Sequence, residues 1–247
     1  MELKPTDLEF TSAADALTWL VAMGADEIVL EQPVDRFAES AKVAAPVAPK
    51  VAPQPAALAQ IIDVSGLNSI AEITQALNFL ETHPLKKSAS KLSFFEGPER
   101  ADILIIADHP RKEEDRSGLV FADKSRLLLT NMLAAIGLKL EDVALMNLLP
   151  WRVLGGATAR PADVQTVLPF AQRAVELVQP KVILAIGGLP GQYLAGADAS
   201  IQRQRGKWLD AGGIPLLVTL HPEELLRNPT LKRMAWRDLQ LFQEKLK

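Results

Sequence analysis

Short apolar runs that favour strands alternate with helical segments from about residue 66 to the end of the chain. The strands are predicted at 103–107, 143–146, 182–186 and 214–220. The helices are predicted at 69–81, 125–136, 162–178 and 231–246, with a short helix after Gly187 and Gly188. Continuous apolar strands joined by helices pack as a parallel sheet covered on both faces. We therefore expect an α/β fold of three layers, α/β/α, around a central four-stranded parallel sheet.

The residues before this region differ from it in composition. Residues 12–23 place apolar side chains at helical spacing and are followed by Gly24, which predicts a short N-terminal helix. Residues 40–57 are mostly Ala, Pro, Val and Lys, a composition that buries little apolar area and restricts the backbone. We expect an N-terminal helical segment over 1–39, a disordered Pro/Ala-rich linker over 40–65 and one folded domain over 66–247.

The composition excludes several classes of protein. The chain of 247 residues has no cysteine, which excludes disulfides and thiolate-ligated metal clusters. Its formal net charge is −3, so a basic surface for nucleic acid would have to be local. Residues 1–5 lack the basic start of a signal peptide, and no uncharged apolar stretch reaches the length of a membrane span. We expect a cytoplasmic protein that does not enter a membrane.

Polar side chains follow three of the predicted strands. Asp108, Asn147 and His221 each stand at a strand's carboxyl end. A single polar residue at such a place is most often a turn former or a helix cap. The carboxyl ends of parallel strands meet at one edge of the sheet, where ligands bind in folds of this kind. Their shared edge therefore favours a site that combines a carboxylate, an amide and an imidazole.

Long motifs surround these strand ends. They read ADHPRKEEDRSGLVF at 107–121, NLLPWR at 147–152, RGKW at 205–208 and HPEELLRNP at 221–229. In order, spacing and flanking strands they resemble the uracil-DNA glycosylase superfamily, and in particular its family 4, the bacterial and archaeal branch. The resemblance runs from about Leu80 to the C-terminus. It implies a hydrolase that cleaves the N-glycosidic bond of uracil in DNA, as in base excision repair.

The resemblance also implies roles for individual residues. Asp108 takes the acidic position that helps to place the attacking water, and His221 that of the histidine donating to uracil O2. Phe121 matches the aromatic residue that stacks on the flipped base, and Asn147 the amide that reads the pyrimidine edge. Leu225 lies where a residue can wedge into the duplex. The basic side chains that can hold phosphates near the mouth of the site are Arg203, Arg205, Lys207 and Arg227.

The chemistry of base release agrees with these roles. Breaking the bond leaves a uracil anion and a sugar cation, so a donor at O2 and a carboxylate near the sugar both lower the barrier. Asparagine can donate to uracil O4 and accept from N3–H, whereas cytosine presents the reversed pattern. The base must leave the stack to reach these groups, and a mismatched or damaged base does so at least cost.

The chain departs from family 4 at its cofactor positions. Four cysteines bind an iron–sulfur cluster in that family, and they align with Leu80, His83, Trp151 and Val167. None of the four is cysteine here, and three of the replacements are apolar. We therefore expect no cluster and no other metal, with packing taking over the scaffold role. His83 is interpreted as a helix-end residue.

Further departures fall in the loops around the site. The family's Gly-Glu-Ala-Pro-Gly has Ala107 and Arg111 in place of its two glycines, so Arg111 either crowds the pocket or reaches a phosphate. In the family's motif Pro-Phe-Val-Gly, the position of the glycine is occupied by Asp123 in this chain. The Asn-Arg pair that the family has in the loop after Arg152 is absent here. Where the family has His-Pro-Ala-Tyr, this chain has Glu223 and Glu224 in place of the alanine and the tyrosine. Their negative charges should weaken DNA binding.

Three functions are compatible with these patterns. The first is an active, monomeric uracil-DNA glycosylase acting on uracil-containing DNA. The second is a catalytically degenerate paralogue that binds DNA or protein, which the altered loops favour. The third, a nucleotide-binding protein with a phosphate at Gly187-Gly188, is weakly supported because that loop lacks a full phosphate-binding signature. No sequence feature identifies a partner for the N-terminal segment.

Overall fold

The computed structural model describes residues 63–246 apart from 157 and 199. The helix expected over 12–23 lies outside the described residues, as does the expected linker up to residue 62. The described residues all belong to one compact unit of the chain.

The described strands form a single sheet in the order β1-β3-β2-β4-β6-β5. Its inner strands β3, β2, β4 and β6 are parallel neighbours, which confirms the predicted parallel core. The register pairs Ala107 with Asn147 on one side and with Ile186 on the other, and Ile186 with Thr219. The strands are β1 (Phe95–Glu96), β2 (Ile103–Ala107), β3 (Ala144–Asn147), β4 (Val182–Ile186), β5 (Trp208–Ala211) and β6 (Ile214–Thr219).

The expected count of four strands is wrong, because an antiparallel strand is added at each edge. β1 has only two residues, too few for a periodic pattern in the sequence. β5 and β6 form a hairpin through Gly212 and Gly213, whose φ angles of 66° and 91° suit a two-residue turn. Gly-Gly before an apolar run is a hairpin signal, so β5 could have been found from the sequence.

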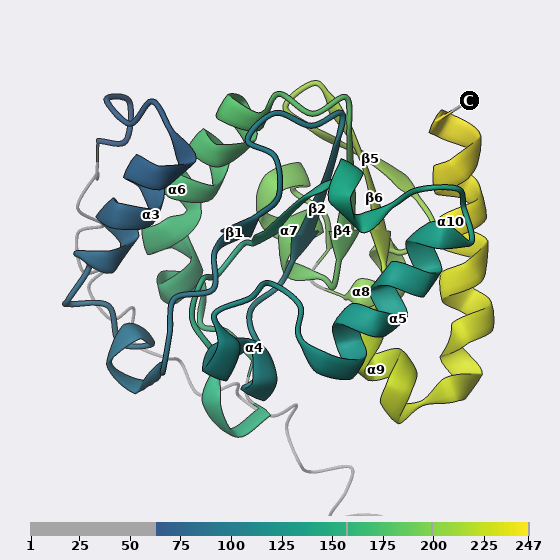
Figure 1. The fold of residues 1–247 in the computed structure, drawn as a ribbon, viewed down its shortest axis with the longest axis horizontal. Helices are drawn as coiled ribbons and strands as arrows, with labels where there is room; N and C mark the ends of the chain where they lie inside the picture. Colours follow the sequence, from purple (N-terminus) through teal and green to yellow (C-terminus); the bar gives the residue numbers. More distant parts are fainter. Residues whose placement is uncertain (1–62, 157, 199, 247) are drawn as a thin grey trace, which may run out of the picture. The chain divides into compact units, whose positions relative to one another are not determined.

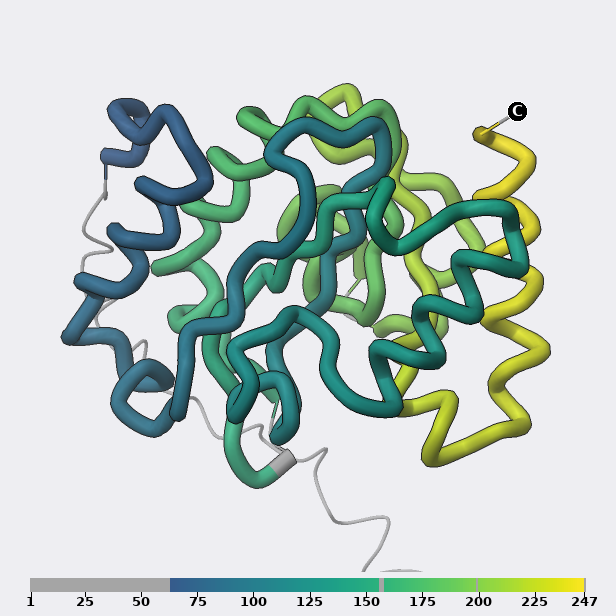
Figure 2. Tube along the Cα trace, in the orientation of Figure 1, coloured from purple at the N-terminus to yellow at the C-terminus, as the bar shows by residue number. Residues whose placement is uncertain are grey.

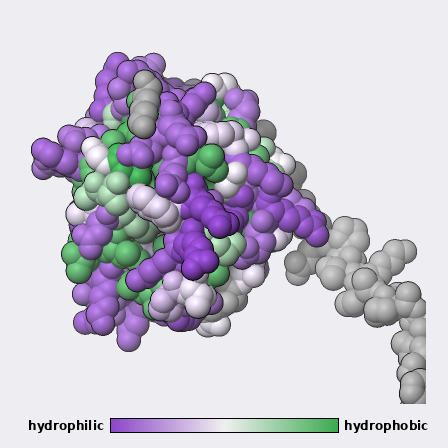
Figure 3. Space-filling model, turned by 90° about the vertical axis from the view of Figure 1, so that its right-hand side faces the viewer, coloured by the Kyte–Doolittle hydropathy of each residue, from purple (hydrophilic) through white to green (hydrophobic). Residues whose placement is uncertain are grey.

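Helices cover both faces of the sheet (Figure 1). α3 (Ile70–Asn78) and α6 (Pro161–Val178) pack on one face, and α5 (Asp123–Ala134) and α10 (Lys232–Leu246) on the other. Each face has its own core of buried side chains, and alternate residues of β2 belong to one or the other. The trace in Figure 2 follows the same three layers, and around α10 the surface is largely hydrophilic with separate apolar patches (Figure 3).

Short elements connect the layers. They are η2 (Lys86–Ser88), α4 (Lys112–Ser117), η3 (Leu140–Asp142), η4 (Leu154–Gly156), α7 (Leu189–Ala195), α8 (Ile201–Gln204), α9 (Pro222–Arg227) and η5 (Pro229–Leu231). α4 and α9 lie together at the lower edge in Figure 1, where the parallel strands end. No helix among the described residues is long and apolar enough to cross a membrane.

The first described helix shows how local signals set boundaries. Ser69 caps it, with its Oγ accepting the N–H of Glu72 at 3.2 Å, as the capping pattern predicts. The helix ends at Asn78, three residues before the predicted end at 81. Phe79 is the C-cap and is largely exposed, so no buried contact extends the helix beyond it.

Candidate active site

A cavity of about 620 Å³ opens at the carboxyl ends of the parallel strands. Asp108 follows β2, Gly187 follows β4 and His221 follows β6, and all three line it. The parallel register places these strand ends side by side, so the cavity is a direct product of the topology. The structure therefore brings together the two residues predicted to carry the chemistry.

The turn after β4 holds the Asp108 carboxylate. Its Oδ1 accepts the N–H of Leu189 at 2.8 Å. Gly187 has a φ of 103°, and a Cβ added to it would lie 2.1 Å from Asp108 Oδ2. Only glycine leaves room for the carboxylate against this backbone. The Gly187-Gly188 loop therefore receives a carboxylate of the protein itself, and its N–H groups are not left free to cradle a phosphate.

Burial governs the charge of Asp108. It raises the pKa of Asp108 to about 6, although the N–H of Leu189 and the charge of Arg111 both favour the ionised form. At neutral pH the group is a carboxylate with a strong affinity for a proton. A carboxylate in that state can orient a water molecule and take up its proton.

His221 is held as a neutral hydrogen-bond donor. It caps α9, and its Nδ1 accepts the N–H of Glu223 at 3.2 Å. Burial holds the pKa of His221 well below its usual value, and the charge of Arg111 lowers it further. The neutral ring therefore carries its proton on Nε2, which has no hydrogen-bond partner among the described residues. This nitrogen is available to donate to a ligand.

Phe121 and Asn147 are not among the residues that line the cavity. The ring of Phe121 is 5.6 Å from that of His221, at 31° to it, and is fully buried. Asn147 is also fully buried, at the end of β3. Of the two base-binding residues predicted from the motifs, Phe121 therefore lies beside the imidazole, and neither is in contact with solvent.

Arg111 lines the cavity, and its guanidinium contacts two neighbouring side chains. Its Nη1 donates to Nε2 of His109 at 2.9 Å, and Nδ1 of His109 bonds to the carbonyl of Pro110. Its Nε is 3.2 Å from a carboxylate oxygen of Glu223, an ion pair without hydrogen-bond geometry. Glu223 also pairs with Arg227 at 3.2 Å. The guanidinium of Arg111 is therefore engaged within the protein, which favours crowding of the pocket over contact with a phosphate.

The five residues predicted to contact DNA have different surroundings. Arg203 is exposed and pairs with Asp198 at 2.8 Å. Arg227 is exposed and lines the cavity, and Lys207 is exposed where β5 begins, at the same edge of the sheet. Arg205 is turned inward, where it donates to Asp238 at 2.6 Å and to the carbonyl of Met234. Leu225 is buried in the core, whereas the next residue, Leu226, is exposed. Arg205 and Leu225 are therefore not placed to contact DNA in this structure.

Sequence reasoning missed several residues that build the site. Glu114 is buried and accepts the N–H groups of both Arg111 and Ala122, so it ties the cavity loop to the segment of Phe121. Ser93 is buried beside Asn147 and bonds to it. His109 stands beside Asp108 in a chain with only three histidines, a signal that could have been used. Ser93 gives no such signal, because nothing local distinguishes it.

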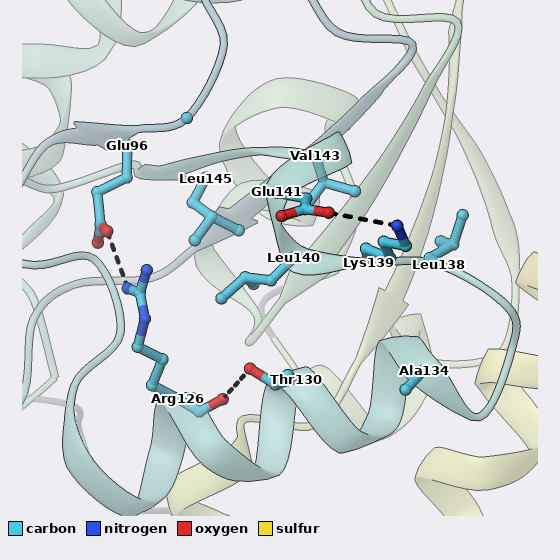
Figure 4. A pocket seen from close by; sticks show the side chains of 11 residues that line it. Glu96, Arg126, Thr130, Ala134, Leu138, Lys139, Leu140, Glu141, Val143 and Leu145 are labelled. Carbon is cyan, nitrogen blue, oxygen red and sulfur yellow. Dashed lines mark hydrogen bonds and ion pairs between the residues drawn. The ribbon is translucent and has the colours of Figure 1, made fainter.

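A second hollow, of about 520 Å³, lies between α5, β1 and η3 (Figure 4). Its walls are largely apolar, with Leu140 and Leu145 among them. Arg126 is paired with Glu96 at 2.8 Å, and Lys139 with Glu141 at 3.4 Å. Its charged side chains are thus engaged with one another, which leaves the first cavity as the better candidate for chemistry.

Fold and site define an α/β protein with a carboxylate and a neutral imidazole at the carboxyl edge of its parallel strands. The chain belongs to the uracil DNA glycosylase superfamily, whose family model matches residues 94–240. It is similar to the Type-4 uracil-DNA glycosylase of Thermotoga maritima, with 30% identity over 64% of this chain and 84% of the relative. The Type-4 enzymes of Archaeoglobus fulgidus (29%, over 55% and 72%) and Pyrobaculum aerophilum (26%, over 64% and 85%) are also similar.

The positions aligned with the family's cluster cysteines do not fit an iron–sulfur cluster. Trp151 and Val167 are fully buried in one apolar core, and Leu80 packs against it. The ring of His83 lies 4.6 Å from that of Trp151, and its two nitrogens bond to the carbonyl of Asp163 and the N–H of Leu85. Three of the four side chains thus offer iron no ligand atom, and the only possible ligand among them, His83, has both ring nitrogens engaged within the protein.

The positions of the lost family glycines differ in what they demand of the backbone. Ala107 lies within β2, and Arg111 has a φ of −88°, so neither needs glycine for its conformation. Asp123, at the start of α5, has a φ of 45°. Aspartate adopts this left-handed region more readily than most residues do. Asp123 therefore takes a left-handed conformation after Phe121 at the position of the family's glycine.

We predict that Asp108→Asn lowers activity without lowering stability. The folded-state pKa of about 6 lies above the reference value of 3.8, so the folded protein favours the protonated form and the ionised carboxylate costs stability above pH 6. At pH 8 the variant should melt at the wild-type temperature or higher. Wild-type activity should fall as the pH drops through 6, which gives the pH–rate profile an acid limb. The variant's profile should lack this acid limb.

The matched control is Asp115→Asn, because Asp115 is also buried but bonds to Ser90 and does not line the cavity. It should melt at a lower temperature and keep the acid limb. Thermal melts and pH–rate profiles measure both effects. An unchanged acid limb in Asp108→Asn would rule out the assigned role of Asp108.

Proposed function

We propose that this protein hydrolyses the N-glycosidic bond of uracil in DNA and so acts in base excision repair. The observation that carries the proposal is the convergence of Asp108 and His221 on one cavity, one as a carboxylate with a raised pKa and the other as a neutral donor. The names of the Type-4 relatives support the same activity.

The reaction follows from the protonation states of these two residues. As the bond between C1′ and the base breaks, its electron pair moves onto the base, and Nε2–H of His221 donates to O2 of the developing anion. The Asp108 carboxylate orients a water molecule toward C1′ and accepts its proton as the new C–O bond forms. The products are an abasic sugar and free uracil, once the anion has taken up a proton.

The DNA would reach the site along the edge that carries α4 and α9. The base has to leave its stack to meet His221, as in other enzymes that act on single bases. Arg227, Lys207 and Arg152 are the basic side chains proposed to hold phosphates, because the first two are exposed at this edge and Arg152 lines the cavity. Glu223 and Glu224 reduce the positive potential there, so modest affinity for DNA is expected.

We propose that the reaction needs no metal cofactor. The side chains at the positions aligned with the family's cluster cysteines are packed in the interior, which supports this proposal. Hydrolysis of an N-glycosidic bond by an acid–base pair also requires no redox centre. The purified protein should be colourless and should contain no stoichiometric iron, as measured by its visible spectrum and by metal analysis. An absorption band with bound iron would contradict the proposal.

His221→Ala should lower uracil release by roughly 10²–10³-fold, the loss expected when one donor to a developing anion is removed. The measurement is incubation with a uracil-containing oligonucleotide, followed by alkaline cleavage at abasic sites. His83→Ala is the matched control, because His83 is another buried histidine but lies in the core beside Trp151. It should lower the melting temperature and leave the rate per folded molecule unchanged.

A second function, DNA binding without turnover, is favoured by one observation. Phe121 and Asn147 are fully buried, and Arg111, which lines the cavity, is engaged by His109 and Glu223. If wild-type protein at high concentration releases no uracil from single- or double-stranded DNA, the glycosylase proposal fails. DNA affinity and its dependence on salt would then be the property to measure.

Arg111→Gly separates the two functions. Because the guanidinium is engaged by His109 and Glu223, removing it should open the cavity, raise uracil release and leave DNA affinity unchanged. Arg116→Ala serves as the control, since Arg116 is exposed on α4 and pairs with Glu113 away from the cavity. Weaker DNA binding without faster release would instead assign Arg111 to phosphate contact.

A further inference from the structure

The amide of Asn147 is held in one orientation by a single residue. Its Nδ2 donates to the carbonyl oxygen of Ser93 at 3.0 Å and to Ser93 Oγ at 2.9 Å. Both residues are fully buried. The two hydrogens of the amide group are therefore both engaged within the protein.

The hydrogen bonds of Ser93 make this orientation unambiguous. Its Oγ donates its one hydrogen to the carbonyl of Leu119 at 2.7 Å, so toward Asn147 it can only accept. The carbonyl oxygen of Ser93 can only accept as well. A rotated amide would set its own oxygen against these two acceptors. Nδ2 must therefore face Ser93, and Oδ1 must face away from it.

Oδ1 of Asn147 is buried and has no hydrogen-bond partner among the described residues. A buried acceptor without a donor costs stability, so its retention calls for an explanation. Along β3, Leu145 belongs to the same core as Phe121, and side chains of a strand alternate between faces. The side chain of Asn147 is therefore on the face of the sheet against which Phe121 packs, and the ring of Phe121 lies beside that of His221.

We propose that Ser93 is a positioning residue that makes Asn147 an acceptor only, so that the site selects bases with a ring N–H at this edge. This inference rests on the proposed function. Uracil offers N3–H to Oδ1, whereas N3 of cytosine would set a lone pair against it. No donor from Asn147 is left for uracil O4, so O4 is not read by this residue. The proposed substrates of the site are therefore bases whose ring carries a lactam N–H.

Substrate analogues test the proposal in the wild-type protein. Oligonucleotides containing deoxyuridine, 4-thiodeoxyuridine or N3-methyldeoxyuridine are compared by kcat/KM for base release. Replacing O4 by sulfur weakens that atom as an acceptor and keeps N3–H, so release should stay at least as fast as for uracil. The N3-methyl base should be released on the order of 10²-fold more slowly or not at all. Its methyl group replaces the N3 hydrogen, so the base cannot donate to Oδ1 of Asn147 and is displaced from the productive position. A large loss with the 4-thio base would overturn the proposal.

Side-chain amide exchange tests the orientation without any turnover. In the full-length protein both Nδ2 protons of Asn147 should be strongly protected from solvent exchange in NMR spectra. Ser93→Ala should remove protection from one of them and lower uracil kcat/KM by up to about 10²-fold. Ser90→Ala is the matched control, since it removes a hydroxyl from the same segment that bonds to Asp115 instead.

The outcomes separate the two proposals. Protected protons without any uracil release would reject the glycosylase function and retain the arrangement of Ser93 and Asn147. Uracil release with unprotected Asn147 protons would reject the role of Ser93 and retain the function. Equal effects of Ser93→Ala and Ser90→Ala on protection and rate would reduce Ser93 to a structural residue.

Discussion

The parallel register of β2 with β3 on one side and β4 on the other is the constraint on which the site depends. Ala107 is level with both Asn147 and Ile186, so the polar residues that follow these strands meet at one edge. β6 continues the register and brings His221 to the same place. Hydrogen bonds of the sheet, with apolar cores on both faces, fix the strand ends from which the reacting groups follow.

Two departures from the family pattern compensate each other. Arg111 replaces a glycine after β2 and Glu223 replaces an alanine after β6, and in the structure the two side chains form one ion pair. Arg111 alone would place an additional positive charge beside the cavity, which Glu223 now offsets. A similar exchange has occurred at the cofactor positions, where Trp151 and His83 stack in the interior. In both cases the replacing side chains contact one another.

Much of the fold was predictable from the sequence, because strands such as 103–107 and 182–186 are short, wholly apolar and bounded by turns. Asp108 and His221 were predictable as well, since each directly follows such a strand and the topology brings strand ends together. The wrong expectations concern side-chain direction. Arg205 and Leu225 lie in motifs near the site, but partners distant in the sequence, such as Asp238 and the core around Phe242, turn them inward. Ser93 was missed for the same reason, because its partner is Asn147, far along the chain.

The contact between Gly187 and Asp108 restricts the order in which this site can change in evolution. Because any Cβ at position 187 would collide with the carboxylate, a larger residue there is tolerated only after Asp108 has been replaced by a smaller one. The reverse order is open, since a small residue at 108 leaves glycine in place. A lineage that lost the carboxylate could then fill the space at 187, although the φ of 103° would still strain any residue other than glycine, and restoring aspartate alone would no longer rebuild the site. Loss of the acid would in that way become difficult to reverse.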